Sequence, residues 1–455
     1  MHTVILIERN KNMVALCFYF EVHQPFRINH YRIKEIGAHK TYFNEESNQN
    51  IFEKVAKKCY WPAGLLIASL LKRYPKSFKV TFSMSGTFLE QCETYDPKLL
   101  ELYQDILSLS NAEIICETSH HSLAALIDEE EFYSQIELQR NNIKRLFNRK
   151  VTAFRNTELI YSNHIGKLVE KAGFQTCLLE GWDPYIPKGW NAHHIFHHPE
   201  LQNLKLLPKS YKLSDDLAFR FSNQSWESWP LTTEKYHSWF EKLLDGNHEF
   251  VGLFMDYETF GEHQWADTGI FEFLDRFISN MTYDKRFEFL TVSEAANKFT
   301  ARAPMDVNRP LSWADTERDI SAWLGNRIQE DAFEKVYQLK KQIRYLNDES
   351  LTKEWRKLLT SDHFYYMCIK WSNDGDVHKY FSPFDSPYEA YLDYVNILED
   401  FEMKCAEKVR LKDLAQGTIQ ELAQGNLGEN KECTKTIQAS SPQKKSSPAS
   451  VKMGN

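Results

Sequence analysis

Short apolar runs alternate with amphipathic stretches along most of the chain. The runs that have the length and composition of buried strands lie at 14–22, 79–84, 113–118, 151–154, 176–181, 250–255 and 287–292. Apolar residues on helical spacing predict helices between them at 51–73, 98–109, 129–148, 163–172, 233–245 and 269–280. Apolar strands that alternate with helices predict a parallel sheet with right-handed crossovers.

The repetition of strand–helix units favours a closed or nearly closed barrel. An open doubly wound sheet is the alternative, but no glycine-rich phosphate-binding turn follows the first strand. We therefore predict an α/β fold, a (β/α)7 barrel that is a distorted version of the TIM barrel, over residues 13–305. The pattern loosens at 193–198 and 204–219, which predicts a small antiparallel insertion near 190–230.

The chain changes character after this predicted barrel. Helical patterns follow one another at 313–326, 330–347, 351–359 and 387–409, and 361–371 is compatible with a helix too. They predict a helical C-terminal domain over 306–415. Ser, Lys, Gln and Gly dominate in 416–455, which predicts a disordered tail. Residues 1–12 precede Met13 and are predicted to be an N-terminal extension.

Composition narrows the function classes. A net charge of −8 and a pI near 6.1 argue against a nucleic-acid-binding surface. No apolar stretch approaches the length of a membrane span, and the N-terminus lacks the features of a secretion signal. The 8 cysteines are scattered without a CxxC pair, as expected for reduced thiols in a cytoplasmic protein. The sequence leaves the oligomeric state open.

Polar residues follow nearly every predicted strand. The richest case is FVGLFMDYETFGEHQW (250–265), where an apolar run ends in Asp256 and continues to Glu258, Glu262 and His263. The other strand ends carry Glu21, His23 and Gln24; Glu117, His120 and His121; Arg155, Asn156 and Glu158; Glu180, Trp182 and Asp183; and Glu294. Helix capping alone does not explain polar clusters at the same end of so many strands. In a parallel barrel these ends meet at one rim, where such folds keep their chemistry.

Several of these segments resemble the ordered signatures of glycoside hydrolase family 57. They are EVHQPFR (21–27), ETSHHSL (117–123), FRNTE (154–158), MDYETFGEH (255–263) and LTVSEA (290–295). SWADTERDISAWLGNRIQ (312–329), DHFYYMCIKW (362–371) and DGDVHKYFSPF (374–384) resemble the α-amylase branch of that family. The resemblance implies a seven-fold barrel with a helical C-terminal domain, retaining chemistry on α-glucans, and no cofactor or metal.

From the positions that match the family's motifs, the resemblance implies that Glu158 is the nucleophile and Asp256 the general acid and base. Retaining glycosidases hold two such carboxyl groups about 5–5.5 Å apart. We expect the pKa of Asp256 to be raised by its apolar strand and acidic neighbours, and Glu158 to stay ionised beside Arg155 or a histidine. Substrate contacts are expected from His23, Gln24, His121, Arg155, Trp182, Glu258, His263, Trp265 and Trp313.

The predicted function is therefore hydrolysis of α-1,4-glucosidic bonds in starch, glycogen or maltodextrins. A 4-α-glucanotransferase or a branching enzyme of the same family is the alternative. The chain departs from many relatives at Phe154, where Trp is common, at His120, where an aromatic residue is expected, and in DYE (256–258), where other branches have DGE. None of these departures affects the two catalytic carboxylates.

Two rival interpretations belong to other classes. The HHIFHH segment (193–198) has histidines on a spacing that binds zinc on a helix, but it is predicted as a strand or hairpin and contains no carboxylate. A metal-dependent polysaccharide deacetylase, which chelators would inactivate, also places His and Asp at strand ends. A non-catalytic α-glucan-binding protein would bind without turnover, but this chain keeps both candidate carboxylates.

Overall fold

Nine strands of this computed structural model form one sheet. The model describes residues 13–370 and 382–436, with side chains as far as residue 416. The strands are β1 Val14–Val22, β2 Val80–Met84, β3 Ala112–Ile114, β4 Ala153–Arg155, β5 Thr176–Glu180, β6 Phe196–His197, β7 Lys205–Lys209, β8 Phe250–Asp256 and β9 Phe287–Phe289.

Seven of the strands close into a ring. They follow the order β3-β2-β1-β8-β7-β5-β4, and every neighbouring pair is parallel. Just beyond β3, Cys116 forms a parallel bridge with Phe154 of β4, which joins the two ends of the row. Backbone hydrogen bonds from Cys116 N to Ala153 O (3.0 Å) and from Arg155 N to Cys116 O (2.9 Å) complete the junction. The predicted (β/α)7 barrel is confirmed.

The strand membership differs from the prediction at two places. The segment 204–219 was expected in an antiparallel insertion, but its first part forms β7, which pairs in parallel with β5 and β8 as a strand of the ring. Only the short β6 lies antiparallel to β7. The run at 287–292 was expected to form the seventh strand of the ring. It forms only the three-residue β9, which pairs with β1 outside the ring, and β7 is a strand of the ring in its place.

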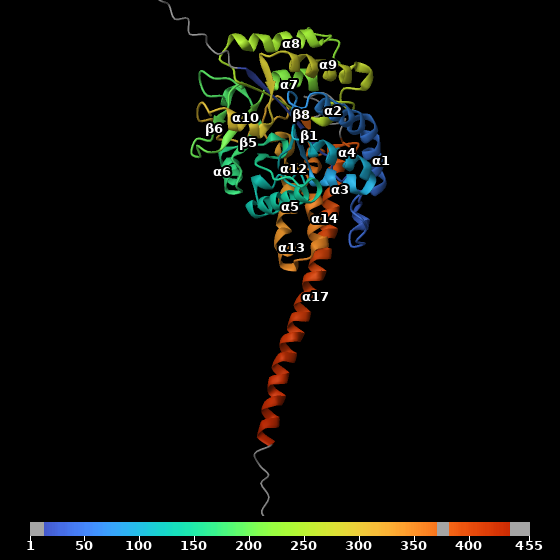
Figure 1. Ribbon diagram of the computed structural model, residues 1–455. Coiled ribbons are helices and arrows are strands. Elements are labelled where there is room, and N and C mark those ends of the chain that lie inside the picture. The colour runs from blue at the N-terminus through green and yellow to red at the C-terminus, as the bar shows by residue number, and fades with distance from the viewer. Residues whose placement is uncertain (1–12, 371–381, 437–455) are drawn as a thin grey trace, which may run out of the picture.

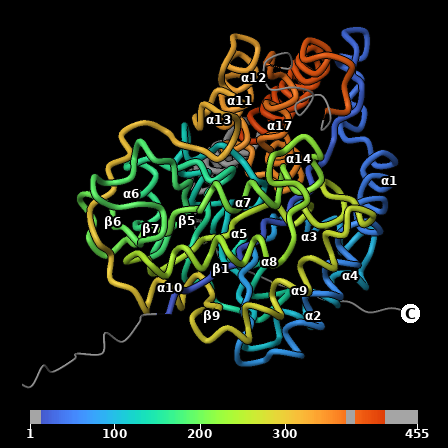
Figure 2. Tube along the Cα trace, turned by 90° about the horizontal axis from the view of Figure 1, so that it is seen from above, coloured from blue at the N-terminus to red at the C-terminus, as the bar shows by residue number. Residues whose placement is uncertain are grey.

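Helices surround the ring and continue after it (Figure 1). In the barrel they are α1 Glu45–Val55, α2 Trp61–Arg73, α3 Gly86–Tyr95, α4 Pro97–Ser108, α5 Glu129–Phe147, α6 Asn163–Lys171, α7 Tyr211–Ala218, α8 Thr233–Glu241, α9 Ile270–Tyr283 and α10 Val292–Lys298. The later helices are α11 Ser321–Leu324, α12 Arg327–Gln338, α13 Lys340–Leu346, α14 Glu349–Leu358, α15 Ser361–Tyr365 and α17 Pro387–Thr436. Figure 2 shows α11 to α14 and α17 together on one side of the barrel.

Alternation along the strands decides which side chains reach the inside of the barrel. In β1, Cys17 and Tyr19 belong to the inner apolar cluster, whereas Phe18 and Phe20 pack under the surrounding helices. Glu21 continues the inner series at the carboxyl end of the strand. The same alternation puts polar inner residues at the ends of other strands: Glu117, Arg155, Glu180, Lys209 and Asp256. The barrel is therefore apolar along its length and charged at one mouth.

The C-terminal part is helical, as predicted, but the predicted tail is wrong in part. Helix α17 extends to Thr436, about twenty residues into the stretch that was expected to be disordered, and it projects from the body of the molecule (Figure 1). Residues 437–455 and the predicted extension 1–12 lie outside the described residues, as does most of the DGDVHKYFSPF segment. None of the described helices combines the length and the apolar character needed to cross a membrane.

Candidate active site

Glu158 follows β4 in a 3-10 turn, Thr157–Leu159, and has left-handed backbone angles of φ 58° and ψ 26°. A residue with a side chain keeps this conformation only where its surroundings enforce it, and such residues concentrate at functional sites. Both carboxylate oxygens of Glu158 are held in place. Oε1 accepts a hydrogen bond from Nε2 of His121 (3.1 Å), and Oε2 accepts one from Nε1 of Trp313 (2.7 Å).

His121 lies among three carboxylates. Its Nε2 faces Glu158, while its Nδ1 lies 3.0 Å from Oε2 of Glu117 and 3.2 Å from Oε1 of Glu21. Ionised carboxylates only accept hydrogen bonds, so an imidazole between them donates from both nitrogens and carries a charge. Burial opposes that charge, but Glu21, Glu117 and Glu158 together raise the pKa of His121 well above its usual value.

This imidazolium determines the state of Glu158. Burial alone would raise the pKa of the Glu158 carboxyl. The hydrogen bond and charge of His121, with smaller contributions from Arg155 and Trp313, outweigh burial and lower that pKa below its usual value. Glu158 is therefore held as an ionised, positioned carboxylate.

Arg155 is a second buried cation near the Glu158 carboxylate. Its side chain is fully buried, its Nη2 forms an ion pair with Oε2 of Glu21, and its Nη1 lies 3.8 Å from Oε2 of Glu117. The pKa of Glu117 is lowered, because His121 and Arg155 outweigh the effect of burial. Removing one member of such a network leaves uncompensated charge in the interior, so these residues depend on one another. Arg155 thus supports the site through its buried ion pairs with Glu21 and Glu117.

His23 is stacked on His121 and bonded at both nitrogens. The two ring centroids are 4.0 Å apart and the ring planes differ by 20°. Nδ1 of His23 lies 2.8 Å from Oγ of Ser85, and Nε2 lies 2.9 Å from Oδ2 of Asp362. Burial and the charge of His121 lower the pKa of His23, so it is the neutral member of the stacked pair. Since its ring nitrogens and those of His121 are occupied, the expected contacts of both with sugar hydroxyls stay predictions.

Asp362 brings the helical part into the site. It lies in α15, and His23 lowers its pKa despite burial. The Ser85–His23–Asp362 chain resembles a nucleophile triad in composition. However, Ser85 is completely buried and its Oγ caps α3 by accepting from Phe88 N (3.2 Å). The chain therefore fixes the His23 ring instead of activating a hydroxyl.

Asp256 ends β8 on another part of the rim, with Glu21 opposite it in β1. It is half-buried, and its electrostatics are opposite to those of Glu158. Burial raises the pKa of Asp256, the charge of His263 offsets this in part, and the charge of Glu158 raises the pKa further. Burial lowers the pKa of His263 in turn. The proton on the Asp256 carboxyl group is thereby held to a higher pH than on an ordinary aspartic acid.

Glu258 forms part of a chain of hydrogen bonds that starts at Gln24. Nε2 of Gln24 donates to the Tyr60 hydroxyl (2.9 Å), and that hydroxyl donates to Oε1 of Glu258 (2.5 Å). Burial and the charge of Asp256 raise the pKa of Glu258 to about 8. Tyr60 ends a single π turn, Ala56–Tyr60, between α1 and α2, a local distortion that often marks functional sites. Gln24 is thus buried and engaged within the protein.

Trp313 is the predicted aromatic residue that contacts the candidate nucleophile. Besides its bond to Glu158, its ring lies 5.1 Å from the Arg155 guanidinium and 5.2 Å from the Lys209 ammonium. Arg318 holds its loop by donating to Trp313 O (2.7 Å) and to Oε2 of Glu180 (2.8 Å). Trp313 is therefore held in place beside Glu158 by contacts with charged residues of the barrel and with Arg318.

The two other predicted aromatic platforms lie apart from this network. Trp182 is half-buried after β5 and packs against Tyr185, with ring centroids 5.8 Å apart. Trp265 is 54 % exposed after β8, with Lys58 5.2 Å from its ring centroid. Neither is hydrogen-bonded to Glu158 or Asp256. Their role as sugar platforms stays a prediction, and Glu262 beside them pairs with Lys54 and Lys58.

The four histidines of 193–198 do not converge on a common point. His194 donates from Nε2 to Asn247 O (2.6 Å), and His198 donates from Nε2 to Asn163 O (2.9 Å). Among the described residues, no potential three-ligand metal cluster includes any of the four. Glu21, Glu117 and His121 do lie close enough for one, but Arg155 and the His121 imidazolium already neutralise those carboxylates.

The sequence prediction gave no substrate or catalytic role to several residues of the site. Glu21, Glu117 and Glu180 were noted only as strand-end residues, and Lys209, which was not noted, continues the inner series of its strand in the same way. Asp362 was noted only as part of a family-like segment, and Tyr60 had no signal, because its partners Gln24 and Glu258 are far away in the sequence.

Comparisons with known proteins bear on the family and the fold of this chain. Residues 17–308 match the family model described as glycosyl hydrolase family 57. A curated protein of Methanocaldococcus jannaschii named "Putative alpha-amylase" is 41% identical over 406 residues, which are 86% of this chain and 84% of that protein.

Two solved structures share the fold at low sequence identity. A branching enzyme from Thermococcus kodakaraensis has a TM-score of 0.61 at 13% identity, over 88% of this chain and 91% of that one. A 4-alpha-glucanotransferase from Thermococcus litoralis has a TM-score of 0.54 at 19% identity, over 84% of this chain. This chain spans 59% of the length of that glucanotransferase.

Proposed function

Because the chain belongs to glycosyl hydrolase family 57, we propose that it cleaves α-1,4-glucosidic bonds in α-glucans with retention, using Glu158 and Asp256. Glu158 is the proposed nucleophile and Asp256 the proposed general acid and base. The substrate class rests on the name of the Methanocaldococcus jannaschii relative together with the signature segments. Membership of the family makes the protein a glycoside hydrolase.

The observation that carries this proposal is the opposite pKa shifts of two carboxyl groups on one rim. The pKa of Glu158 is lowered by a charged imidazole and an indole N–H, while that of Asp256 is raised by burial and by the charge of Glu158. Double displacement requires one ionised carboxylate and one protonated carboxyl group at the same pH. A site built only to bind sugar has no need for this asymmetry.

In the proposed reaction, Glu158 attacks the anomeric carbon while Asp256 protonates the departing glycosidic oxygen. His121 and Trp313 orient the attacking carboxylate. Asp256, then ionised, takes a proton from the incoming water, which releases the sugar and restores both residues. If a second sugar replaces water, the same steps transfer the chain instead of hydrolysing the bond.

Incubation of the purified full-length protein with maltoheptaose, with and without EDTA, tests the activity. We expect shorter maltooligosaccharides alone, with the same rate in EDTA. A ladder of both longer and shorter products would identify a transferase, and EDTA-sensitive turnover would support metal-dependent chemistry instead. The absence of products would favour a non-catalytic glucan-binding protein.

Single isosteric substitutions test the two roles. Glu158→Gln and Asp256→Asn should each lower kcat by about 10³-fold or more with an unchanged circular dichroism spectrum, because each removes a group that acts in the transition state. Glu294→Gln is the matched control, since Glu294 lies at the N-terminus of α10 and pairs with Lys79. Near-normal activity of either site variant would disprove its assignment.

A further inference from the structure

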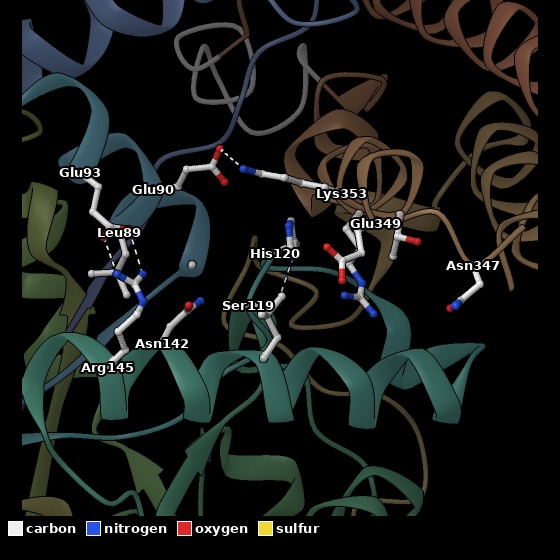
Figure 3. A pocket seen from close by; sticks show the side chains of 14 residues that line it. Leu89, Glu90, Glu93, Ser119, His120, Asn142, Arg145, Asn347, Glu349 and Lys353 are labelled. Atoms are coloured by element: carbon white, nitrogen blue, oxygen red, sulfur yellow. Dashed lines mark hydrogen bonds and ion pairs between the residues drawn. The ribbon is translucent and has the colours of Figure 1, made fainter.

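A cavity of about 550 Å³ lies where the barrel meets the helical part. One face each of α3, α5 and α14 lines it, together with Ser119 and His120 from the segment after β3 (Figure 3). None of the proposed catalytic or substrate-contacting residues lines it. Its volume suits a small metabolite, since ligand sites usually measure about 300–1,000 Å³.

His120 stands in this cavity with one ring nitrogen unused. It is 6% exposed, its Nδ1 lies 2.9 Å from Oγ of Ser119, and its backbone N–H donates to Gln135 (3.2 Å). Its Nε2 makes no hydrogen bond with any residue of the described parts of the chain. Figure 3 shows the ring rising from the cavity floor between α5 below and Lys353 above. The residue is buried, but this nitrogen faces the cavity, so it can form a hydrogen bond with a bound ligand.

The surroundings of that nitrogen are cationic. Lys353 and Lys357 share one carboxylate, Glu90, at 3.0 and 2.8 Å, which leaves one positive charge uncompensated. Arg356 lines the wall and is held by Glu131, with Nε 2.7 Å from Oε1. Besides burial, the charges of Arg356, Lys357 and Lys353 lower the pKa of His120 well below its usual value. An anionic group would find a hydrogen-bonding nitrogen with Arg356, Lys357 and Lys353 around it, in a lining that contains three acidic and three basic residues as a whole.

Other residues of the cavity lining offer different chemistry. They include Asn142 from α5, Asn347 after α13 and Glu349 at the start of α14, and Glu349 forms no ion pair with a described residue. Amide and carboxylate groups of this kind pair with hydroxyl groups. No Trp, Tyr or Phe of the described residues lines the cavity, so these residues supply no flat surface on which a glucan chain would stack.

We propose that this cavity binds a phosphorylated sugar, with its phosphate against His120, Lys353 and Arg356 and its hydroxyls toward Asn142 and Glu349. The anionic end explains the unused nitrogen and the cations around it. The hydroxyl-bearing end explains the amides and the unpaired carboxylate. The site is separate from the catalytic cleft and independent of the proposed hydrolase activity.

Isothermal titration calorimetry on the full-length protein tests the proposal with glucose 6-phosphate, inorganic phosphate and glucose as probes. We expect glucose 6-phosphate to bind with a Kd of about 1 mM or below, inorganic phosphate to compete with it, and glucose alone not to bind measurably. No binding of either phosphate compound, or equal binding of glucose, would overturn the proposal.

Substitutions locate the binding. His120→Asn and Lys353→Gln should each weaken glucose 6-phosphate binding by about tenfold, as expected when one contact to an anion is lost. Lys335→Gln is the control, because Lys335 is an exposed lysine of α12 paired with Asp331 just as Lys353 is with Glu90. Since Lys353 is 58% exposed, its replacement leaves folding intact even if His120→Asn does not. Unchanged affinity in Lys353→Gln would place any bound phosphate elsewhere and overturn the proposal.

Discussion

Glu158 shares its carboxylate with a charged imidazole, and this pairing predicts a pH effect. In His121→Gln, the group that most strongly lowers the pKa of Glu158 is lost, so that pKa rises. The nucleophile is then protonated at a higher pH, and the acidic limb of the kcat/KM profile moves toward neutrality. Profiles measured from about pH 4 to about pH 9 would show the shift.

His120→Asn is the matched control for this shift. It changes the neighbouring histidine, whose side chain lines the cavity between α3, α5 and α14, and should leave the acidic limb in place. An acidic limb that stays in place in His121→Gln as well would mean that His121 does not control the ionisation of Glu158.

Glu258 differs from its neighbour Asp256 in the expected effect of replacing its carboxyl group by an amide. With a pKa of about 8 it is mostly protonated at neutral pH, so glutamine is a close replacement there. Glu258→Gln should keep kcat within about threefold of wild type at pH 7, in contrast to Asp256→Asn. Parallel assays of the two variants at one pH decide this. A loss as large as that of Asp256→Asn would mean that the ionised form of Glu258 is required.

At the residue scale, the sequence predicted the direction of the pKa shifts at Glu158 and Asp256, while the catalytic roles of both stay predictions. The apolar residues before Asp256 and the position of Arg155 close to Glu158 were visible as local patterns. The engagement of both nitrogens of His23 was not, because Asp362 lies 339 positions away in the chain. A contact of that kind depends on how the helical part packs, which no local pattern encodes.

The β7–β8 seam contains a single registered pair of residues, as does the Cys116–Phe154 junction that closes the ring. The two strands meet where Lys209 lies opposite Gly252, and Ser210 N donates to Gly252 O (2.8 Å). A Cβ at Gly252 would lie 2.6 Å from Pro208 O, a rigid backbone atom. Gly252→Ala should therefore push β7 from β8 and destabilise the fold by about 2–4 kcal/mol.

Chemical denaturation of Gly252→Ala beside Gly189→Ala checks this. Gly189 has a positive φ of 87° but open space around its Cβ position, so its variant carries backbone strain without a clash. Equal losses in both variants would contradict a tight seam.

The same seam shows why β7 was misassigned from the sequence. Pro208 stands inside it, and proline argues against a central strand because it has no N–H to donate. Here Pro208 belongs to the short strand β7, where it pairs with Leu179 of β5 next to the β7–β8 seam. The longer strands β1 and β8, which are apolar apart from Glu21 and Asp256 at their carboxyl ends, were predicted to within a residue or two.

At the scale of the whole molecule, the first half of α17 fastens the C-terminal part to the beginning of the chain. The buried carboxylate of Asp400 accepts from Gly37 N (2.6 Å) and from the Tyr42 hydroxyl (2.7 Å). Beyond residue 416 the helix projects away from the body (Figure 1). Ending the chain after 416 should shift Tm by less than about 2 °C, whereas Asp400→Asn should lower it by about 5 °C or more.

Thermal unfolding of the two variants at one scan rate makes the comparison. A large fall in Tm for the shortened chain would show that the distal helix docks on the body.

Two hydrogen bonds join the barrel to the part of the chain that follows it: one between Glu158 and Trp313, the other between His23 and Asp362. They bear on how this enzyme could be recombined with its relatives. A chimera joined at residue 305 would combine a nucleophile from one parent with the indole and carboxylate of the other. Its two halves could each fold and still be mismatched by fractions of an ångström at the reacting atoms. The smallest piece that can be exchanged intact therefore extends through α15, and crossovers that respect this limit should retain turnover far more often than crossovers at the edge of the barrel.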